Sequence, residues 1–219
     1  MKILLYDYPK SSASWRVRIA LRLKKISYES MQIDLASSKQ LEPEFRAINP
    51  NESVPVIVFE DDEESKKSIV LTQSLAIIEF LNEVFANHGV DLMKDNMLHT
   101  AQVREIAQLI ACDIHAVQNL RVCKAASELG NIERPEWAAR FIERGFVALE
   151  RHLQHTAGDF CVGNSVSMAD ICLVPQVYNA YRWKVSLEDF PIIRRITKSC
   201  LAMKEFQEDF VGPLTAALA

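Results

Sequence analysis

The character of the sequence changes near residue 88, and this change most constrains the fold. Strand and helix patterns alternate through the first 85 residues, whereas no strand pattern follows them. Apolar residues then recur with helical spacing over four long stretches, which are 97–125, 134–155, 168–182 and 191–207. The sequence therefore predicts an α/β domain over residues 1–85 and an all-helical domain over residues 90–219.

The elements of the first half can be placed in order. KILLYDY, VPVIVFE and SIVL are typical of strands, and ISYESMQIDL alternates apolar and polar residues as a half-buried strand does. SWRVRIALRLKK and QSLAIIEFLNEVF are amphipathic helices, and a polar, loosely helical segment lies between the second and third strands. The charged segment EDDEESKKS is expected to form the loop of a hairpin. The predicted order is β-α-β-α-β-β-α.

Composition excludes several classes of protein. The 219 residues are 49% hydrophobic and 25% charged, as in an ordinary globular protein. A formal net charge of −4 gives no reason to expect nucleic acid as a partner. No apolar stretch reaches the ~20 residues that a membrane span needs, and no secretory leader is expected.

The cysteines predict a reducing compartment. Their number is odd, and they form no CxxC pair. Reduced thiols in the cytoplasm are the simplest account, and no metal site is expected. Cys112 and Cys123 are eleven residues apart, as are Cys161 and Cys172, which suits buried positions on helices.

Small hydroxyl residues crowd the start of the first predicted helix. Ser11, Ser12 and Ser14 lead directly into an arginine-containing amphipathic run. The unpaired N–H groups and the positive dipole end of a helix favour an anion at this point, and serine hydroxyls can donate to it. One of these serines can equally be an ordinary helix cap. Arg16 and Arg18 cannot share a helical face, so we expect one to reach the site or a domain interface and the other to be structural.

Several motifs resemble those of the zeta class of glutathione transferases. They are SSASWRVRIAL, NPNESVPVIVFE, TQSLAIIEFL and GNSVSMADICLVPQVYNA, in this order, and the resemblance covers nearly the whole chain. It implies a thioredoxin-like domain followed by a helical bundle domain, with glutathione as the cofactor. One position departs from the class, because Ala13 replaces the cysteine of the usual SSCSW motif.

The resemblance implies a set of glutathione-binding residues. Ser11 would be the main stabiliser of the thiolate, and Ser12 and Ser14 would line the same site. The other implied contacts are the backbone of Val54 before a cis Pro55, the helix start at Gln73 and Ser74, and the side chains of Gln40 and His115. Outside the resemblance, Thr72 or Ser74 is explained as a plain cap, and a lone His on a helix is usually structural. Ser167 and Asp170 form the pattern of a capping box and are assigned to folding.

A dicarboxylate substrate would need cationic anchors. The resemblance points to Lys10, Asn119, Arg121 and Arg182, and a planar guanidinium can hold a carboxylate through two hydrogen bonds. His115 and Asn119 are four residues apart and are expected to share a helical face.

The implied function is glutathione-dependent cis–trans isomerisation of maleylacetoacetate to fumarylacetoacetate, in the breakdown of tyrosine or other aromatic compounds. The thiolate adds to the cis double bond, rotation follows, and elimination returns glutathione. A maleylpyruvate isomerase and a general conjugating transferase are the alternatives within the fold, and a non-catalytic interaction module is an alternative outside catalysis. The resemblance also implies a cytoplasmic homodimer.

Overall fold

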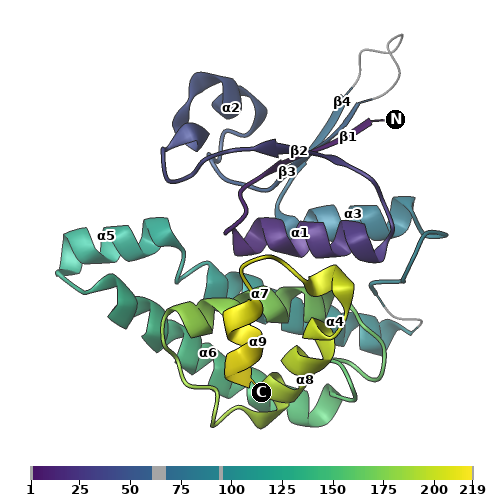
Figure 1. Cartoon of the computed structure of the whole chain (residues 1–219), viewed down its shortest axis with the longest axis vertical. Helices are drawn as coiled ribbons and strands as arrows, with labels where there is room; N and C mark the ends of the chain where they lie inside the picture. The colour runs from purple at the N-terminus through teal and green to yellow at the C-terminus, as the bar shows by residue number, and fades with distance from the viewer. Residues whose placement is uncertain (1, 61–67, 94–95, 219) are drawn as a thin grey trace. The chain divides into compact units, whose positions relative to one another are not determined.

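The computed structural model describes residues 2–60, 68–93 and 96–218. The chain divides into two compact units, Met1–Leu92 and Met93–Ala219 (Figure 1). The first unit contains all four strands of the described residues, and the second contains helices. The predicted domains, 1–85 and 90–219, differ from these units only in the residues next to the boundary.

The first unit is built on one four-stranded sheet in the order β2-β1-β3-β4. The strands are β1 (Lys2–Asp7), β2 (Glu29–Gln32), β3 (Val56–Glu60) and β4 (Ser68–Thr72). β2 runs parallel to β1, while β3 is antiparallel to both β1 and β4. The parallel pair requires a crossover, which the helix α1 (Ser12–Leu23) supplies.

Helices cover both faces of this sheet (Figure 1). α1 packs beside α3 (Ser74–Val84), and the ring of Phe59 of β3 packs at a tilt against that of Phe80 of α3. Phe45 of α2 (Pro43–Ile48) belongs to a cluster with Val56 and Val58 of β3. Because side chains alternate along a strand, this cluster lies on the face of the sheet opposite to Phe59. A sheet covered on both faces explains why β3 is a continuous apolar run. The predicted β-α-β-α-β-β-α order is confirmed, with a short 3-10 helix, η1 (Lys39–Leu41), before α2.

The second strand is shorter than predicted. The alternating pattern covers residues 26–35, but only Glu29–Gln32 form β2, because β2 pairs only with the segment 4–7 of β1. Residues 61–67 of the predicted hairpin loop lie outside the described residues.

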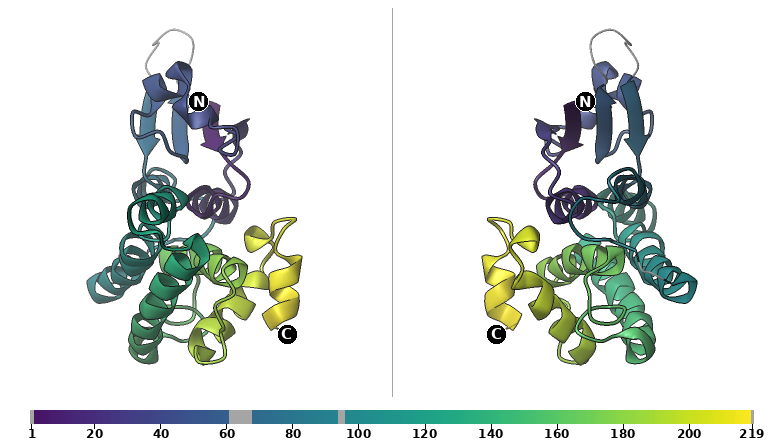
Figure 2. Two further views of the ribbon diagram at one scale, coloured as in Figure 1. Left: turned by 90° about the vertical axis from the view of Figure 1, so that its left-hand side faces the viewer. Right: turned by 90° about the vertical axis from the view of Figure 1, so that its right-hand side faces the viewer.

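The second unit is helical around α7 (Met168–Arg182) (Figure 2). Most residues of α7 are buried, and α7 contacts α4 (Met97–Gln108), α8 (Pro191–Leu201) and the π-helix η2 (Leu109–His115). Its other helices are α5 (Leu120–Gly130), α6 (Arg134–Thr156), the 3-10 turn η3 (Lys204–Phe206) and α9 (Gly212–Leu218). The predicted capping box is confirmed, because Asp170 accepts hydrogen bonds from the Ser167 N–H and hydroxyl at 2.8 and 2.9 Å.

Three predictions about the helical half were wrong. The stretch 97–125 is not one helix but α4, η2 and α5, with a turn before Leu120. The stretch 191–207 ends as an α-helix at Leu201, and α9 follows where no helix was predicted. His115 and Asn119 therefore do not lie on one regular helical face, since η2 ends at His115 and Asn119 caps α5.

The cysteine prediction holds in part. Cys123, Cys161, Cys172 and Cys200 are buried, whereas Cys112 is exposed, and Cys161 lies outside any helix. The five cysteines form no disulfide. Among the described residues, no group of His, Cys, Asp and Glu suits a metal ion. No helix in the described ranges combines the length and apolar character needed to cross a membrane.

Candidate active site

The start of α1 presents a hydroxyl group that can donate a hydrogen bond to a ligand. Ser11 is the N-cap of α1, and its Oγ accepts a hydrogen bond from the Ser14 backbone N–H at 3.2 Å. Because Oγ acts as the acceptor in this bond, the Ser11 O–H remains able to donate to a ligand. The first turn of α1 contains no acidic residue. This helix end therefore favours an anion through both its dipole and its cap.

The three predicted serines differ in exposure. Ser11 and the neighbouring Ala13 are half-buried, whereas Ser12 is 6% exposed and Ser14 is fully buried. The hydroxyl of Ser14 faces Asp7 and opposes the rise that burial causes in the pKa of that carboxyl group. Ser14 therefore reaches the cap through its backbone N–H, and its side chain belongs to the interior.

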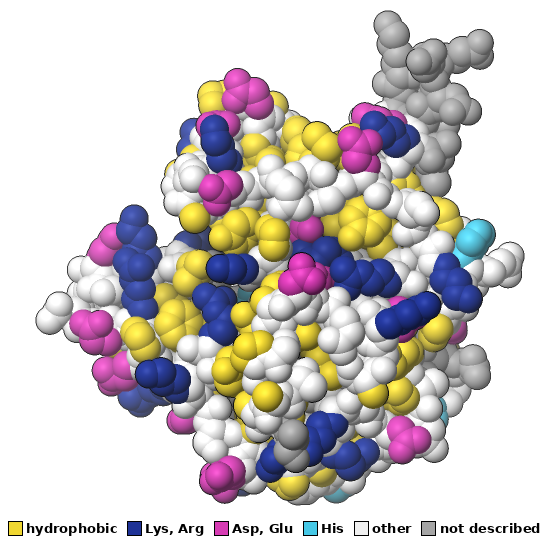
Figure 3. Space-filling model, viewed as in Figure 1, with side chains coloured by type: hydrophobic (Ala, Val, Ile, Leu, Met, Phe, Trp, Pro, Cys, Tyr) yellow, Lys and Arg dark blue, Asp and Glu magenta, His cyan; other side chains and the backbone are white. Residues whose placement is uncertain are grey.

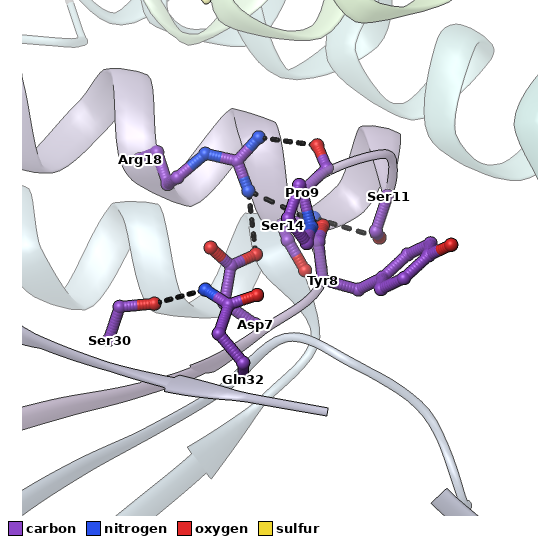
Figure 4. Close-up of polar contacts among 8 residues, drawn as sticks. All are labelled: Asp7, Tyr8, Pro9, Ser11, Ser14, Arg18, Ser30 and Gln32. Atoms are coloured by element: carbon purple, nitrogen blue, oxygen red, sulfur yellow. Dashed lines mark hydrogen bonds and ion pairs between the residues drawn. The ribbon is translucent and has the colours of Figure 1, made fainter. Parts of the chain in front are cut away.

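A buried ion pair holds the loop that precedes Ser11 (Figure 4). The Arg18 guanidinium contacts the Asp7 carboxylate at 2.6 Å and donates to the Pro9 carbonyl at 2.9 Å. Burial raises the pKa of the Asp7 carboxyl group above its ordinary value, although Arg18 and Ser14 oppose this rise. Arg18 is thus the structural arginine of the predicted pair, and it ties the segment before Ser11 to the end of β1.

Arg16 reaches the other helix start of this unit. Its side chain is buried, and Nη1 donates to the Ser74 Oγ at 3.4 Å. A guanidinium has no acceptor, so the Ser74 oxygen must be the acceptor and its proton is directed elsewhere. Of the two arginines, Arg16 is therefore the one whose side chain contacts Ser74. The sequence indicated that Arg16 and Arg18 would differ but did not distinguish which one would reach Ser74.

The backbone before α3 has an unusual conformation. Gln73 has φ of 69° and ψ of 113°, a region that residues other than glycine rarely adopt. Its side chain is exposed, and Ser74 begins a helix whose first turn contains no acidic residue. A second N–H-rich helix end thus lies beside a hydroxyl donor, as an anion site requires.

Four further predicted residues lie in the first unit. The Val54–Pro55 peptide bond is cis, as the resemblance implied, and it directly precedes β3. Gln40 is half-buried in η1, and its Oε1 atom is buried with no hydrogen-bond partner among the described residues. Such an atom can be satisfied by a ligand. Lys10, between Pro9 and Ser11, is exposed.

The remaining predicted residues lie in the second unit. His115 ends η2 and is half-buried, and Asn119 accepts a hydrogen bond from the Arg121 backbone N–H at 3.1 Å as the N-cap of α5. Arg121, in the first turn of α5, and Arg182, at the end of α7, both have exposed side chains. These two guanidinium groups are available to solutes at the surface of the unit.

Charges of both signs are interspersed over the helical unit on the face shown in Figure 3. This mixture agrees with the small net charge of the chain. Electrostatic attraction at the site must therefore come from individual cations and helix ends.

Comparisons with known proteins identify the family. The family model described as the N-terminal domain of glutathione S-transferase matches residues 10–84. The maleylacetoacetate isomerase of Mus musculus is 45% identical over 208 residues, which are 94% of this chain and 91% of that protein.

Solved structures agree with this match. The maleylacetoacetate isomerase of Anaeromyxobacter dehalogenans with glutathione bound in its active site has a TM-score of 0.85 and 36% identity, covering 94% of this chain and 93% of that one. The same protein was solved with dicarboxyethyl glutathione and citrate in the active site. A maleylpyruvate isomerase described as a zeta-class glutathione S-transferase has a TM-score of 0.83 and 32% identity, covering 93% and 94% of the two chains. This chain belongs to the zeta class of glutathione transferases, together with the maleylacetoacetate isomerases.

Proposed function

We propose that this chain is a glutathione-dependent cis–trans isomerase that converts maleylacetoacetate to fumarylacetoacetate. The proposal rests on one observation. The Ser11 hydroxyl lies at a helix start without acidic residues, and its proton is available for a hydrogen bond. A hydrogen bond to the charged form of a thiol lowers the thiol pKa, and so does a helix N-terminus. The similarity to maleylacetoacetate isomerases supports this choice of reaction.

The first unit offers a donor set that fits glutathione. Ser74 and the N–H groups at the start of α3 suit the γ-glutamyl carboxylate, with Gln73 beside them. The backbone of Val54, before the cis Pro55, suits the cysteinyl residue, as a strand pairs with its neighbour. The Gln40 Oε1 atom, which has no hydrogen-bond partner among the described residues, can accept from a donor at the glycyl end, such as the glycyl N–H. We also assign His115 to glutathione binding, as the resemblance implies.

The protein contributes orientation and charge stabilisation to this mechanism. Bound glutathione supplies a thiolate that adds reversibly to the cis double bond. The Ser11 hydroxyl donates a hydrogen bond to that sulfur and so favours its ionised form, while Ser12 and Ser14 belong to the same helix start. The Asp7–Arg18 pair fixes the loop that carries Ser11. No side chain is required as a strong general base, because thiol ionisation precedes the reaction.

The substrate carboxylates require cations. We assign Lys10, Arg121 and Arg182 to this role, with Asn119 as a hydrogen-bonding partner. All three cations are exposed, so carboxylate binding costs little desolvation of buried charge. A guanidinium can bind a carboxylate through two parallel hydrogen bonds, which orients the substrate and leaves its central bond able to rotate.

Maleylpyruvate isomerisation is the second candidate, favoured by the structural similarity to a maleylpyruvate isomerase. The two candidates are separated by measuring the isomerisation of maleylacetoacetate and maleylpyruvate, each with and without glutathione. We expect the higher kcat/KM with maleylacetoacetate, and activity only with glutathione. A higher kcat/KM with maleylpyruvate selects the second candidate, and isomerisation that is independent of glutathione refutes both.

A non-catalytic module is the remaining alternative. Retention on immobilised glutathione and elution by free glutathione would argue against it, and failure to bind would refute the isomerase proposal. We further propose a cytoplasmic location, in keeping with five cysteines that form no disulfide, and a homodimer. Sedimentation velocity tests the homodimer, and a single species with the mass of one chain would contradict it.

A further inference from the structure

The helix that begins at Met97 changes its winding before it reaches the proposed substrate residues. α4 passes into the π-helix η2 at Leu109, and η2 ends at His115. A non-helical turn, residues 116–119, then leads into α5. π-helical segments are rare and frequently occur at functional sites. The geometry of this turn therefore determines where Asn119 and Arg121 lie.

Gly145 of α6 makes room for the π-helix. A Cβ atom at this position would lie 2.3 Å from Ile114 Cγ1 and 2.5 Å from Ile114 Cδ1. Ile114 is fully buried, so its side chain has little room to move away. Alanine normally stabilises a helix interior relative to glycine. Close packing against Ile114 supplies a reason for glycine in the middle of α6.

Trp137 of α6 holds the turn itself. Its indole Nε1–H donates to the Val117 carbonyl at 3.0 Å, and its ring packs against Phe141 with centroids 4.7 Å apart. Trp137 and Gly145 are eight residues apart, so they lie on the same side of α6. Cys123 donates its thiol to the next carbonyl, that of Gln118, at 3.3 Å. The Val117 and Gln118 carbonyls of the turn thus each accept a hydrogen bond from a specific side chain.

We propose that Trp137 and Gly145 are positioning residues that set the 116–119 turn and thereby orient Asn119 and Arg121 toward the dicarboxylate substrate. The inference rests on the proposed function, which assigns Asn119 and Arg121 to substrate binding. Gly145 sets how closely η2 approaches α6, because Ile114 of η2 packs on it. Trp137 sets the direction of the chain after it. Neither residue touches the substrate.

The test uses Trp137→Phe, which removes the indole donor and retains an aromatic ring beside Phe141. Without its donor the Val117 carbonyl must find another partner, so the turn relaxes. We expect the KM for maleylacetoacetate to rise about three- to tenfold, the value of one hydrogen bond, with the KM for glutathione unchanged. Gly145→Ala is expected to change the same constant in the same direction.

Two reference variants make the outcomes distinguishable. Phe146→Leu weakens the packing of α6 at a fully buried position whose ring meets Phe190 edge to face, so it should lower the melting temperature and leave both KM values unchanged. Arg121→Met removes a proposed substrate anchor and should raise the KM for maleylacetoacetate alone.

Different results overturn different statements. If Arg121→Met raises the substrate KM and Trp137→Phe does not, the positioning role is wrong and the proposed function stands. If Trp137→Phe behaves like Phe146→Leu, or raises both KM values equally, its role is only structural. If Arg121→Met also leaves the substrate KM unchanged, the substrate assignment itself fails.

Discussion

Replacing Ser11 with alanine tests the proposed source of thiolate stabilisation. A hydrogen bond to a charged group contributes about 1.5–3 kcal/mol, and one pKa unit corresponds to about 1.4 kcal/mol. Loss of the Ser11 hydroxyl should therefore raise the pKa of bound glutathione by about 1–2 units. The geometry allows this hydrogen bond, because the hydroxyl oxygen accepts from the Ser14 N–H and its proton remains available for the sulfur.

The effect on rate is smaller than the effect on ionisation. Where the pKa lies above the assay pH, the thiolate fraction falls about 10–100-fold for such a rise in pKa. A more basic thiolate is a better nucleophile, and a Brønsted coefficient of about 0.5 recovers roughly half of this loss on a logarithmic scale. Isomerase activity at neutral pH should thus fall about three- to tenfold. Because the pKa is raised, the acid limb of the pH–activity profile should move to higher pH.

The assay combines ultraviolet titration of the bound thiolate with the pH profile of kcat. Ser11→Ala also removes a helix cap, which costs about 1 kcal/mol of stability. Asn96→Ala is the matched control, since Asn96 caps α4 by accepting the His99 N–H at 2.8 Å. It should lower stability to a similar extent without moving the thiol pKa. If Ser11→Ala binds glutathione with an unchanged thiol pKa and an unchanged kcat profile, Ser11 is not the main donor.

Three further outcomes are expected. Ala13→Cys should change isomerase activity by less than Ser11→Ala does, because the thiolate is stabilised by the hydroxyl and the helix end; a larger gain in kcat would give the missing thiol the main role. Asp170→Ala should lower the free energy of unfolding in urea by about 2–5 kcal/mol, because a buried carboxylate that accepts three hydrogen bonds is lost; an unchanged denaturation midpoint would contradict its structural role. A thiol reagent at mildly alkaline pH should label the exposed Cys112 rapidly, whereas burial raises the pKa of the Cys200 thiol and should protect it until the protein unfolds. Equal labelling rates in the native protein would contradict this difference.

The order of elements in the first unit could be predicted because each one has a clear local pattern. β3 is a continuous apolar run in a sheet covered on both faces, and α1 and α3 are amphipathic with recognisable starts. The length of β2 could not be predicted, because its pairing is limited by the available segment of β1. An alternating pattern shows which residues can form a strand but not where the neighbouring strand ends.

The π-helix is the clearest failure of the sequence pattern. Apolar spacing continued through residues 97–125, and a π turn shifts the helical phase without any distinctive residue type. The π-helix packs on α6, where Ile114 lies close to Gly145, and no local pattern contains this tertiary contact. α9 was missed because a seven-residue helix is too short for a periodicity to be distinguished.

The positions of the candidate site residues were predictable where a sequence motif marks them. Ser11, Ser74 and the cis Pro55 lie at a helix cap, a helix start and a strand entry, as expected. The pairing of Arg16 with Ser74 and of Arg18 with Asp7 was not predictable, because it depends on which face of α1 meets the sheet and which meets α3. Hydrogen-bond direction at Ser11 and Ser74 likewise required the structure.

The central claim is that glutathione is returned unchanged after each isomerisation. Maleylacetoacetate in large excess over a limiting amount of glutathione provides the most direct measurement, with fumarylacetoacetate and free glutathione quantified at completion. We predict many molecules of product per molecule of glutathione, no reaction without glutathione, and full recovery of the free thiol. Product formation that stops at one equivalent with a stable adduct would contradict the claim and identify a conjugating transferase instead.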